Sequence, residues 1–290
     1  MKSAVRNETI LGYTLLAPAL IGLGVFVIVP MIWAFAISFF QWDLLNPPRF
    51  INIGNYLELV RDEQFLRSLK QSLVFSLEVI PLLFISSLFL ALVLNQRFVR
   101  GRPVFRFLYF SPAVVSMVIV SIVWRFILDP SFGFANYLLH WFQIPRQPWL
   151  SSVRQALPVI GLVTVWKSVG YYMIIFLAGL QTIPAEYYEA ARIDGVSAVQ
   201  NFRYITFPLL RTTNIFVLVI TTIESLRTFT QIYVMTQGGP ARSTFVIALD
   251  IYRNAFVFQK MGYAASMAVV LFFIILLLSI VERKYVKEGY

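Results

Sequence analysis

The sequence predicts an all-α integral membrane protein with about six transmembrane helices. The chain is 59% hydrophobic and 13% charged, with a mean hydropathy of +0.74, whereas soluble domains are roughly 45–50% apolar and 25% charged. Its apolar residues gather into runs long enough to cross a hydrocarbon core of about 30 Å as helices of about 20 residues. The alternating segments of about ten residues that indicate membrane β-strands do not occur in the sequence. We therefore expect a single transmembrane domain over residues 1–290.

Six apolar runs follow one another along the chain. The first follows Lys2 and Arg6, as a secretion signal does, but it is far longer than the roughly 7–15 apolar residues of a signal core. We therefore expect it to stay in the membrane as an anchor. Prolines within the runs are tolerable because neighbouring helices can satisfy the backbone groups that proline leaves unpaired. The predicted spans are Leu11–Phe40, Leu73–Leu94, Phe107–Leu128, Ala156–Leu180, Thr212–Met235 and Tyr263–Val281.

Arginine residues set the predicted orientation in the membrane. The link between the second and third spans carries Arg97, Arg100, Arg102 and Arg106, and short loops rich in Lys and Arg stay in the cytoplasm. With an even number of spans, both termini then lie in the cytoplasm of a multi-pass protein of the cell (inner) membrane. The net charge of +10 fits this topology and anionic lipid headgroups better than nucleic acid, whose footprint is a basic patch on a soluble fold.

A polar, helix-forming segment, residues 181–210, lies between the fourth and fifth spans and is expected on the cytoplasmic side. Pro184 stands near a helix start, and Asp194-Gly195 supplies a turn. The pattern therefore predicts a first short helix that ends at the glycine.

A second short helix is predicted after that turn. Ser197 precedes Gln200 by three positions, which is the spacing of a capping box, and Pro208 is expected to end the helix. Glu189 would project from the first helix, beside small alanines that let another surface approach closely. The plainer interpretation is a solvated loop whose acidic and basic residues balance.

The sequence lacks the residues that several kinds of catalytic, metal-binding and nucleotide-binding site require. The chain has no cysteine, which excludes disulfides, thiolate metal sites and cysteine nucleophiles. Its single histidine, His140, lies beside Trp141 in a predicted outer loop, where an interfacial structural role is expected. No G-x-x-x-x-G-K-[ST] loop occurs, so the usual phosphate cradle for a nucleotide is missing. We therefore expect no catalytic residue, no metal site and no cofactor bound by this chain.

The spacing within the polar segment is specific. Glu189-Ala190-Ala191, then Asp194-Gly195, then Ile205 and Pro208 resembles the Glu-Ala-Ala loop of permease subunits in binding-protein-dependent ABC importers. The similarity extends along most of the chain and points to the carbohydrate-uptake branch, in the subunit type of the first permease of maltose and glycerol-phosphate importers. Further patches that resemble this family are Asn52-Ile53-Gly54-Asn55-Tyr56, Asp129-Pro130-Ser131-Phe132-Gly133, Gly238-Gly239-Pro240 and Gly262-Tyr263-Ala264-Ala265-Ser266-Met267.

The resemblance implies that residues 181–210 are a cytoplasmic coupling loop. In that family the loop docks into a cleft on the ATPase subunit, so Glu189 would meet a basic residue there and Gly195 would allow the turn. Phe207 stands where the family usually has leucine, which keeps hydrophobic docking feasible. The ATPase-coupling residues implied are Glu189, Ala190, Ala191, Asp194, Gly195, Ile205 and Pro208.

The resemblance also implies the partners. They are a second, similar permease subunit, two ATPase subunits that would bind ATP and Mg, an extracytoplasmic solute-binding protein, and a sugar or sugar derivative; no nucleic acid is expected. A pump favours two arrangements of its helices in turn, and this chain holds no nucleotide site to bias them. The outer loops expected to form much of the dock for the binding protein are Gln41–Gln71, Asp129–Gln155 and Thr236–Lys260.

Polar stripes mark the two spans that flank the coupling loop. An ionisable group near the centre of a membrane helix costs roughly 2.5–3.5 kcal/mol on insertion scales, so Lys167, Glu224 and Arg227 should face a cavity or one another. Residues spaced i, i+3, i+4 and i+7 share one helix face. The predicted substrate-path residues are Thr164, Lys167, Ser168 and Tyr171 on the fourth span and Thr221, Glu224, Ser225 and Thr228 on the fifth.

Two interpretations of these stripes stay open. A water-filled sugar site needs side-chain donors and acceptors for the sugar hydroxyls, and the family's sugar contacts lie on these two helices. Alternatively, Lys167 and Glu224 form a buried ion pair and the threonines hold helices together, as small polar residues often do. The two arrangements are compatible with each other, and with either a neutral oligosaccharide or an acidic sugar.

Two other classes of membrane protein would show different features in the sequence. A self-sufficient secondary transporter would relay protons through Glu224 and Lys167 and often shows two similar halves, but no internal repeat is visible. A membrane-embedded enzyme would present a catalytic cluster, whereas this sequence has isolated ionisable residues. The predicted function is therefore that of a non-catalytic permease subunit of an ATP-driven sugar importer.

Overall fold

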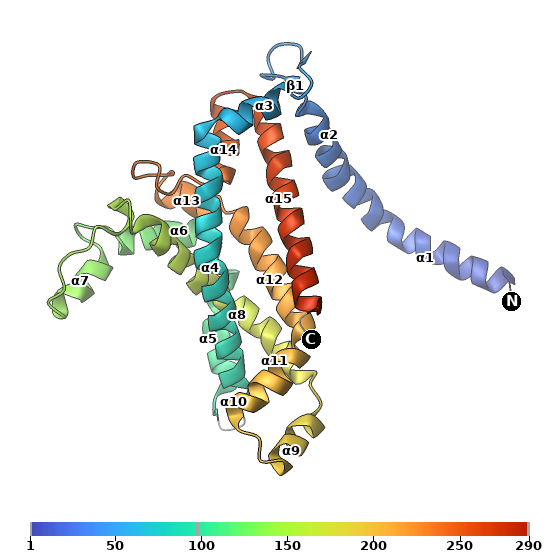
Figure 1. Cartoon of the computed structure of the whole chain (residues 1–290), viewed down its shortest axis with the longest axis vertical. Helices are drawn as coiled ribbons and strands as arrows, with labels where there is room; N and C mark the ends of the chain where they lie inside the picture. The colour runs from blue at the N-terminus through green and yellow to red at the C-terminus, as the bar shows by residue number, and fades with distance from the viewer. Residues whose placement is uncertain (1, 97–98, 289–290) are drawn as a thin grey trace. The chain divides into compact units, whose positions relative to one another are not determined.

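The structure is a computed structural model that describes residues 2–96 and 99–288 (Figure 1). Arg97 and the two chain ends, on which the predicted orientation partly depends, lie outside the described residues, as do the side chains of Lys2 and Arg6. The described residues are helical apart from short connections and one antiparallel pair of two-residue strands, in which Phe40 lies opposite Phe50.

The elements alternate long helices with short helical turns. Turns η1, η3 and η4 are π-helical and η2 is a 3₁₀ turn. In chain order the elements are α1 (Lys2–Leu23), η1 (Gly24–Ile28), α2 (Val29–Ile37), β1 (Phe40–Gln41), β2 (Arg49–Phe50), α3 (Gly54–Arg61), α4 (Glu63–Asn95), α5 (Arg102–Val114), α6 (Met117–Ile127), α7 (Phe134–Trp141), η2 (Trp149–Ser151), α8 (Ala156–Gln181), α9 (Ala185–Ile193), α10 (Ala198–Asn201), η3 (Phe202–Thr206), α11 (Phe207–Leu209), α12 (Arg211–Leu226), α13 (Thr230–Met235), α14 (Ile247–Tyr252), η4 (Arg253–Val257) and α15 (Met261–Glu288).

The prediction of an all-α membrane protein is confirmed. Among the described residues, five helices are long and apolar enough to span a membrane, or up to six if the bent pair α5–α6 forms one span. The five are Leu11–Ile37, Glu63–Asn95, Ala156–Gln181, Arg211–Met235 and Met261–Lys284. The chain divides into two compact units, Met1–Asp62 with Ile251–Phe272 (unit 1) and Glu63–Asp250 with Phe273–Tyr290 (unit 2). The single domain over residues 1–290 stays a prediction.

The third predicted span, Phe107–Leu128, is not one continuous helix. Helices α5 and α6 meet at an angle of 97°, because Val115 and Ser116 adopt extended backbone with ψ of 140° and 137°. Pro112, in the last turn of α5, lacks the N–H that would continue the helical hydrogen bonds. Irregular backbone at membrane depth is tolerated where it is buried in protein or lines a cavity. The bend therefore marks a place where such a cavity is expected.

The second helical segment of the loop, which Pro208 was expected to end, ends one residue after the proline, at Leu209. The chain stays helical from Ala198 to Leu209, and the π turn η3 lies directly before the proline. In this wider turn the N–H of Phe207 bonds to the carbonyl of Phe202, which removes the clash that a proline ring makes in an α-helix. The same device precedes Pro30, which follows the π turn η1.

In unit 1, two of the family-like patches hold the end of α2 in place. Asn55 donates from Nδ2 to the carbonyls of Ser38 and Phe40, at 2.7 and 3.0 Å. Tyr56 forms a 2.6 Å hydrogen bond with the Ser38 hydroxyl. Gly262 lies so close to the Phe40 carbonyl that a Cβ would come within 1.8 Å of it. These contacts explain why this corner uses asparagine, tyrosine and glycine.

In unit 2, helix α8 packs against α4 and α5 and forms much of the core. Phe75, Ile160, Tyr172 and Phe176 are fully buried there, and the rings of Phe84 and Phe176 meet edge to face at 5.2 Å. Small residues let the helices approach closely, as is common in membranes.

Gly170 on α8 is the point of closest approach to α5. A Cβ at this position would lie 1.9 Å from the carbonyl oxygen of Tyr109, and backbone atoms cannot yield as a flexible side chain can. We predict that Gly170→Ala lowers the free energy of unfolding by about 1–3 kcal/mol through overpacking. The measurement is the Tm of the purified full chain in detergent.

Gly12→Ala is the matched control, because a Cβ on Gly12 in α1 has no neighbour within 4 Å in the described part of the chain. Equal Tm values for the two variants would contradict the close packing of α5 on α8.

Candidate functional site

The coupling loop begins with α9 and turns at Gly195. Gly195 has a φ of +72°, which a glycine adopts without the steric cost that a side chain brings. Its N–H bonds to the carbonyl of Arg192 at 3.2 Å, and the N–H of Val196 bonds to that of Ala191 at 2.9 Å. This pair of bonds is a Schellman motif, which satisfies the last carbonyls of a helix. The predicted glycine turn between two short helices is confirmed.

The second helix of the loop starts with the predicted capping box. The Ser197 hydroxyl accepts a bond from the Gln200 backbone N–H, and the Gln200 side chain accepts one from the Ser197 N–H at 2.9 Å. A hydrogen bond of 3.3 Å between the hydroxyls of Tyr188 and Thr206 joins α9 to η3. The loop is therefore an ordered pair of short helical segments joined by hydrogen bonds.

The exposed surface of the loop combines acidic side chains with large apolar ones. Glu189 is exposed, and none of the described residues forms a hydrogen bond or ion pair with its side chain. Ile193 is 87% exposed and Val199 75% exposed. Ile193 lies one turn after Glu189 on α9. Large apolar side chains are thus exposed on both sides of the Gly195 turn.

The other predicted coupling residues differ in exposure. Ala190 and Asp194 are exposed, as is the backbone of Gly195, whereas Ala191 is buried. Ile205 and Pro208 are half-buried in the second helical segment. The structure thus places Glu189, Ala190, Asp194 and Gly195 on the surface, and Ala191 inside the loop. Their role in coupling stays a prediction.

A pocket of about 180 Å³ lies between the two polar stripes in unit 2. It is flanked by Met117, the first residue after the α5–α6 bend, and by the apolar side chains of Val79 and Leu83 on α4. Seven of the eight predicted substrate-path residues line it: Thr164, Lys167, Ser168, Thr221, Glu224, Ser225 and Thr228. The structure therefore brings two stripes that are far apart in sequence into one cavity.

Tyr171, the eighth predicted residue, does not line this pocket. It is exposed and lies one helical turn beyond Lys167, towards the coupling loop. Its neighbour Tyr172, which is fully buried, donates a 2.7 Å hydrogen bond to Oε2 of Glu224. The i, i+7 spacing placed Tyr171 on the correct face of α8 but could not show that the cavity ends one turn earlier.

Lys167 and Glu224 do not form the ion pair of the alternative interpretation within the described residues. The ammonium of Lys167 donates to the carbonyl of Ala113 at 3.2 Å. Ala113 lies in the last turn of α5, where carbonyls have no partner within the helix and a positive charge is favourable. Each ionisable group is thus held by its own partner, and both still line the cavity.

Sequence reasoning missed Gln231 of the pocket. Gln231 is buried and lines the cavity, and its Nε2 donates to the hydroxyls of Thr228 and Thr164 at 3.2 and 3.4 Å. It follows Thr228 by three positions, so extending the stripe on the fifth span by one turn would have found it. The break between α12 and α13 obscured that continuation.

A second link, on the other side of α12, was also missed. The Thr222 hydroxyl donates to Glu282 on α15 at 2.6 Å. Glu282 precedes the basic cluster at the end of the sixth span, which made it resemble a solvated helix end.

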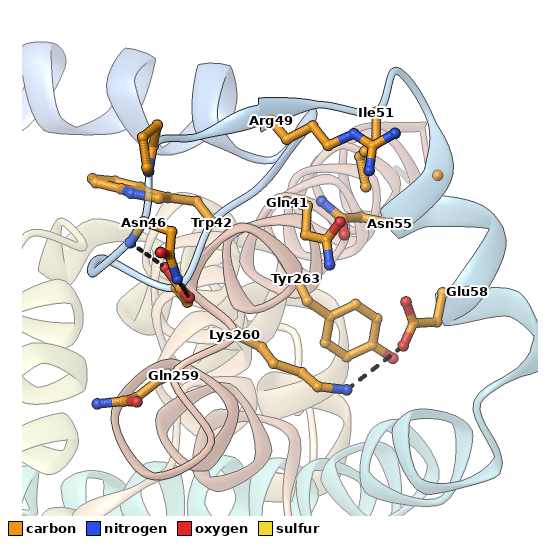
Figure 2. A pocket seen from close by; sticks show the side chains of 13 residues that line it. Gln41, Trp42, Asn46, Arg49, Ile51, Asn55, Glu58, Gln259, Lys260 and Tyr263 are labelled. Atoms are coloured by element: carbon orange, nitrogen blue, oxygen red, sulfur yellow. Dashed lines mark hydrogen bonds and ion pairs between the residues drawn. The ribbon is translucent and has the colours of Figure 1, made fainter.

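Unit 1 contains a separate pocket of about 590 Å³ (Figure 2). Lys260 and Glu58 face each other across it with 3.9 Å between Nζ and Oε1. Asp43 accepts hydrogen bonds from the backbone and side chain of Asn46 at 2.8 and 2.7 Å, which lower the pKa of its carboxyl. All the residues that line this pocket except Tyr263, the first residue of the sixth predicted span, come from the predicted outer loops.

Comparison with known proteins defines the class of the chain. Residues 51–286 match the family of the binding-protein-dependent transport system inner membrane component. The match covers most of the sequence, and the chain belongs to this family. A multi-pass membrane subunit that works with a binding protein is therefore the class of protein that the fold and the family define.

Individual relatives are similar along almost their whole length. The chain is 34% identical to the probable ABC transporter permease protein YurN of Bacillus subtilis, over 98% of this chain and 99% of the relative. It is 34% identical to the trehalose/maltose transport system permease protein MalF of Thermococcus litoralis, over 98% and 95%. It is 32% identical to the sn-glycerol-3-phosphate transport system permease protein UgpA of Agrobacterium fabrum, over 99% and 98%.

A solved structure shows the same fold. A chain of a bacterial ABC transporter involved in the import of the acidic polysaccharide alginate superimposes with a TM-score of 0.85 at 25% identity. The superposition covers 98% of this chain and 97% of that one. The family and these relatives favour an ABC importer permease over a self-sufficient secondary transporter.

The bond from Tyr172 to Glu224 allows a direct test of the cavity geometry. We predict that Tyr172→Phe destabilises the protein by about 1–3 kcal/mol, because a part-buried hydrogen bond to a carboxylate is lost. The measurement is the Tm of the full chain in detergent. Tyr171→Phe is the control, since its hydroxyl has no hydrogen bond among the described residues, and equal Tm losses in the two variants would refute the assignment.

Proposed function

We propose that the chain is the permease subunit of an ATP-driven importer for a sugar or sugar derivative and forms half of the translocation path. The observation that carries the proposal is the coupling loop, in which a glycine-turned helix presents Glu189 beside exposed apolar side chains. Family membership and relatives named for trehalose, maltose and glycerol phosphate support it. The subunit itself is non-catalytic, and two partner ATPase subunits bind the ATP and Mg.

The loop is built to transmit movement to both flanking spans. Helix α8 ends just before it and α12 begins just after it. The two helices are in close contact, because a Cβ on Gly179 would lie 2.4 Å from the Thr213 hydroxyl oxygen. Asn214 also donates to the carbonyl of Phe207 at 3.1 Å, tying α12 to α11. A displacement of the loop by an ATPase therefore moves α8 and α12 together.

Movement of α8 and α12 changes the cavity between them. Both polar stripes of the cavity stand on these helices, and its hydroxyl, amide and charged groups match the donors and acceptors that sugar hydroxyls require. At about 180 Å³ the cavity is small, as expected for half of a path that a second permease subunit completes. The cavity would then open to each side of the membrane in turn, as the ATPase subunits favour first one arrangement of the helices and then the other.

The proposed topology places the coupling loop and both termini in the cytoplasm. The solute-binding protein docks on the opposite side, on the loops Gln41–Gln71, Asp129–Gln155 and Thr236–Lys260. Within unit 2 the coupling loop lies at the end of α8 that is opposite to Ala156 (Figure 1), which supports this division between an ATPase side and a binding-protein side.

Reversing the charge of Glu189 tests the proposed function. We predict that Glu189→Lys leaves membrane insertion intact but abolishes ATP-driven uptake, because a basic side chain repels the basic residue expected in the ATPase cleft. The measurements are uptake into cells and co-purification of the ATPase subunits with the permease.

Glu186→Lys makes the same charge change one turn earlier on α9 and serves as the control. The docking role is wrong if Glu189→Lys retains normal uptake and normal ATPase recruitment. It is also wrong if the two variants lose uptake equally.

The stripe on the fifth span is tested separately. We predict that Glu224→Ala and Ser225→Ala change substrate affinity or the basal ATPase rate of the assembled complex by about tenfold, the loss expected from one hydrogen bond to a charged or polar group. Subunit assembly is expected to be unchanged. Kinetics identical to the unmodified complex in both variants would remove this helix from the substrate path.

A further inference from the structure

A second pocket in unit 2, of about 420 Å³, is lined by a concentration of positive charge. Four cationic side chains, Arg67, Lys70, Arg154 and Arg242, line it together with one carboxylate, that of Glu78. The residues come from three segments: the first turns of α4, the turn before α8, and the loop after α13. They lie far apart in the sequence, so the fold alone brings the four charges together.

The pocket lies on the side of unit 2 opposite to the coupling loop. Helix α8 begins at Ala156, next to the pocket residue Arg154, and ends at Gln181, where the coupling loop starts. A helix of this length spans roughly 39 Å at 1.5 Å per residue. The proposed topology therefore places the pocket on the external face, where Lys and Arg are not favoured by the rule that retains basic residues inside.

Most of this positive charge is not neutralised by the described residues. Arg67 forms an ion pair with Glu63 at 3.1 Å, on an exposed face of α4. Such exposed pairs contribute little, and no other cationic residue of the pocket forms an ion pair in the described part of the chain. Like charges gathered around a pocket repel one another, so a bound anion would stabilise the arrangement.

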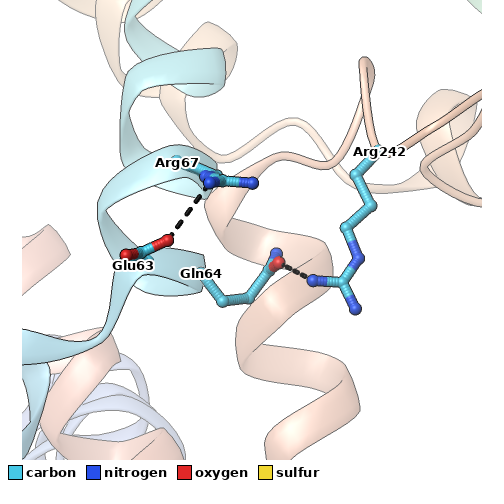
Figure 3. A network of polar contacts seen from close by, with 4 residues as sticks. All are labelled: Glu63, Gln64, Arg67 and Arg242. Atoms are coloured by element: carbon cyan, nitrogen blue, oxygen red, sulfur yellow. Dashed lines mark hydrogen bonds and ion pairs between the residues drawn. The ribbon is translucent and has the colours of Figure 1, made fainter.

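Arg242 is held towards α4 by an unusual loop (Figure 3). Ala241 and Arg242 have positive φ angles of +47° and +61°, a conformation that costs free energy for residues other than glycine and often marks a functional site. The guanidinium of Arg242 donates to Oε1 of Gln64. After the loop, the N–H of Ile247 bonds to the Ser72 hydroxyl at 2.8 Å. The arginine is thus positioned before any ligand arrives.

Ser243 is an independent indication of a ligand site. It lines the same pocket, its side chain is buried with 8% exposure, and its Oγ has no hydrogen-bond partner among the described residues. A buried hydroxyl without a hydrogen-bond partner lowers the stability of the fold. An anion in the pocket would accept a hydrogen bond from it. The hydroxyl and the four cations together suit a ligand group that carries negative charge and accepts hydrogen bonds.

We infer that this pocket is an external binding site for the carboxylate or phosphate group of an acidic saccharide. Arginine guanidinium groups bind both anions through paired hydrogen bonds, and the volume lies within the roughly 300–1,000 Å³ of small-molecule sites. A recessed hydroxyl suits a small ligand better than the surface of a protein. The inference rests on the proposed function and narrows its substrate class to sugars that carry negative charge.

Binding of defined probes to the purified full chain in nanodiscs tests the inference. The probes are digalacturonate, which carries carboxylates, glucose 6-phosphate, which carries a phosphate, and maltose, which is neutral. We expect one or both anionic probes to bind, maltose not to bind, and salt to weaken the binding. Whichever anion binds more tightly identifies the group that the site takes.

Variants distinguish a built site from diffuse attraction. Arg154→Gln and Arg242→Gln should each weaken anion binding about tenfold, and Ser243→Ala about threefold without any change of charge. Arg146→Gln is the control, because Arg146 is exposed and lies in the same predicted outer loop as Arg154 but not in the pocket. Tm values of the variants show that each one folds, and Ser243→Ala is the mildest change.

Three outcomes would overturn the inference. They are the absence of binding for both anionic probes, equal binding of maltose, and an equal loss of binding in Arg146→Gln and Arg242→Gln. The inference is also wrong if the pocket variants weaken only the attachment of an acidic solute-binding protein and the small anions do not bind. ATP-driven uptake that persists in any of these cases, and is lost in Glu189→Lys, would leave the proposed function standing.

Discussion

The contact on which the central cavity depends is the hydrogen bond from the Lys167 ammonium to the carbonyl of Ala113. A membrane offers no water to the backbone groups of a broken helix, so each such group needs a partner from the protein. Helix α5 breaks at Val115, and the carbonyl of Ala113 in its last turn is left without a partner inside the helix. Lys167 supplies a donor and a positive charge at that helix end. One residue therefore allows the bend and lines the cavity that the bend opens.

Helix α8 connects the parts that the proposed mechanism requires. Gly170 lets it approach α5, its face bearing Lys167 lines the cavity, and Gly179 lets it approach α12 beside the coupling loop. A rigid helix with close contacts at both levels transmits a displacement better than one cushioned by long side chains. Tyr172, also on α8, donates a hydrogen bond to Glu224 on α12. Helix α8 therefore positions the acidic group of the cavity as well as Lys167.

Charge is distributed differently at the two levels of unit 2. The central cavity contains one cation and one acid, each held by a separate partner, Ala113 and Tyr172. The pocket at the opposite end from the coupling loop contains four cations around one acid. An acidic sugar would meet strong attraction at the entrance and a nearly balanced site deeper in. This order of sites, from strongly attracting to nearly neutral, favours capture of the ligand and still allows its release.

The sequence by itself determined the features that depend on local pattern. Apolar runs of sufficient length specified the spans, the Ser197-to-Gln200 spacing specified a capping box, and Gly195 specified the turn that ends α9, because each needs only neighbouring residues. Helical spacing also placed seven side chains on the faces that now line one cavity. Periodicity thus predicted which faces matter, though not how far the cavity extends along them.

Tertiary structure alone decided what depends on residues distant in sequence. At the 97° bend of α5–α6, the carbonyl of Ala113 is paired by Lys167 from another helix, and the choice of Tyr172 over Tyr171 depends on where Glu224 lies. The basic pocket collects Arg67, Arg154 and Arg242 from three segments. Helical periodicity describes one helix at a time, whereas packing between helices determines which charges meet.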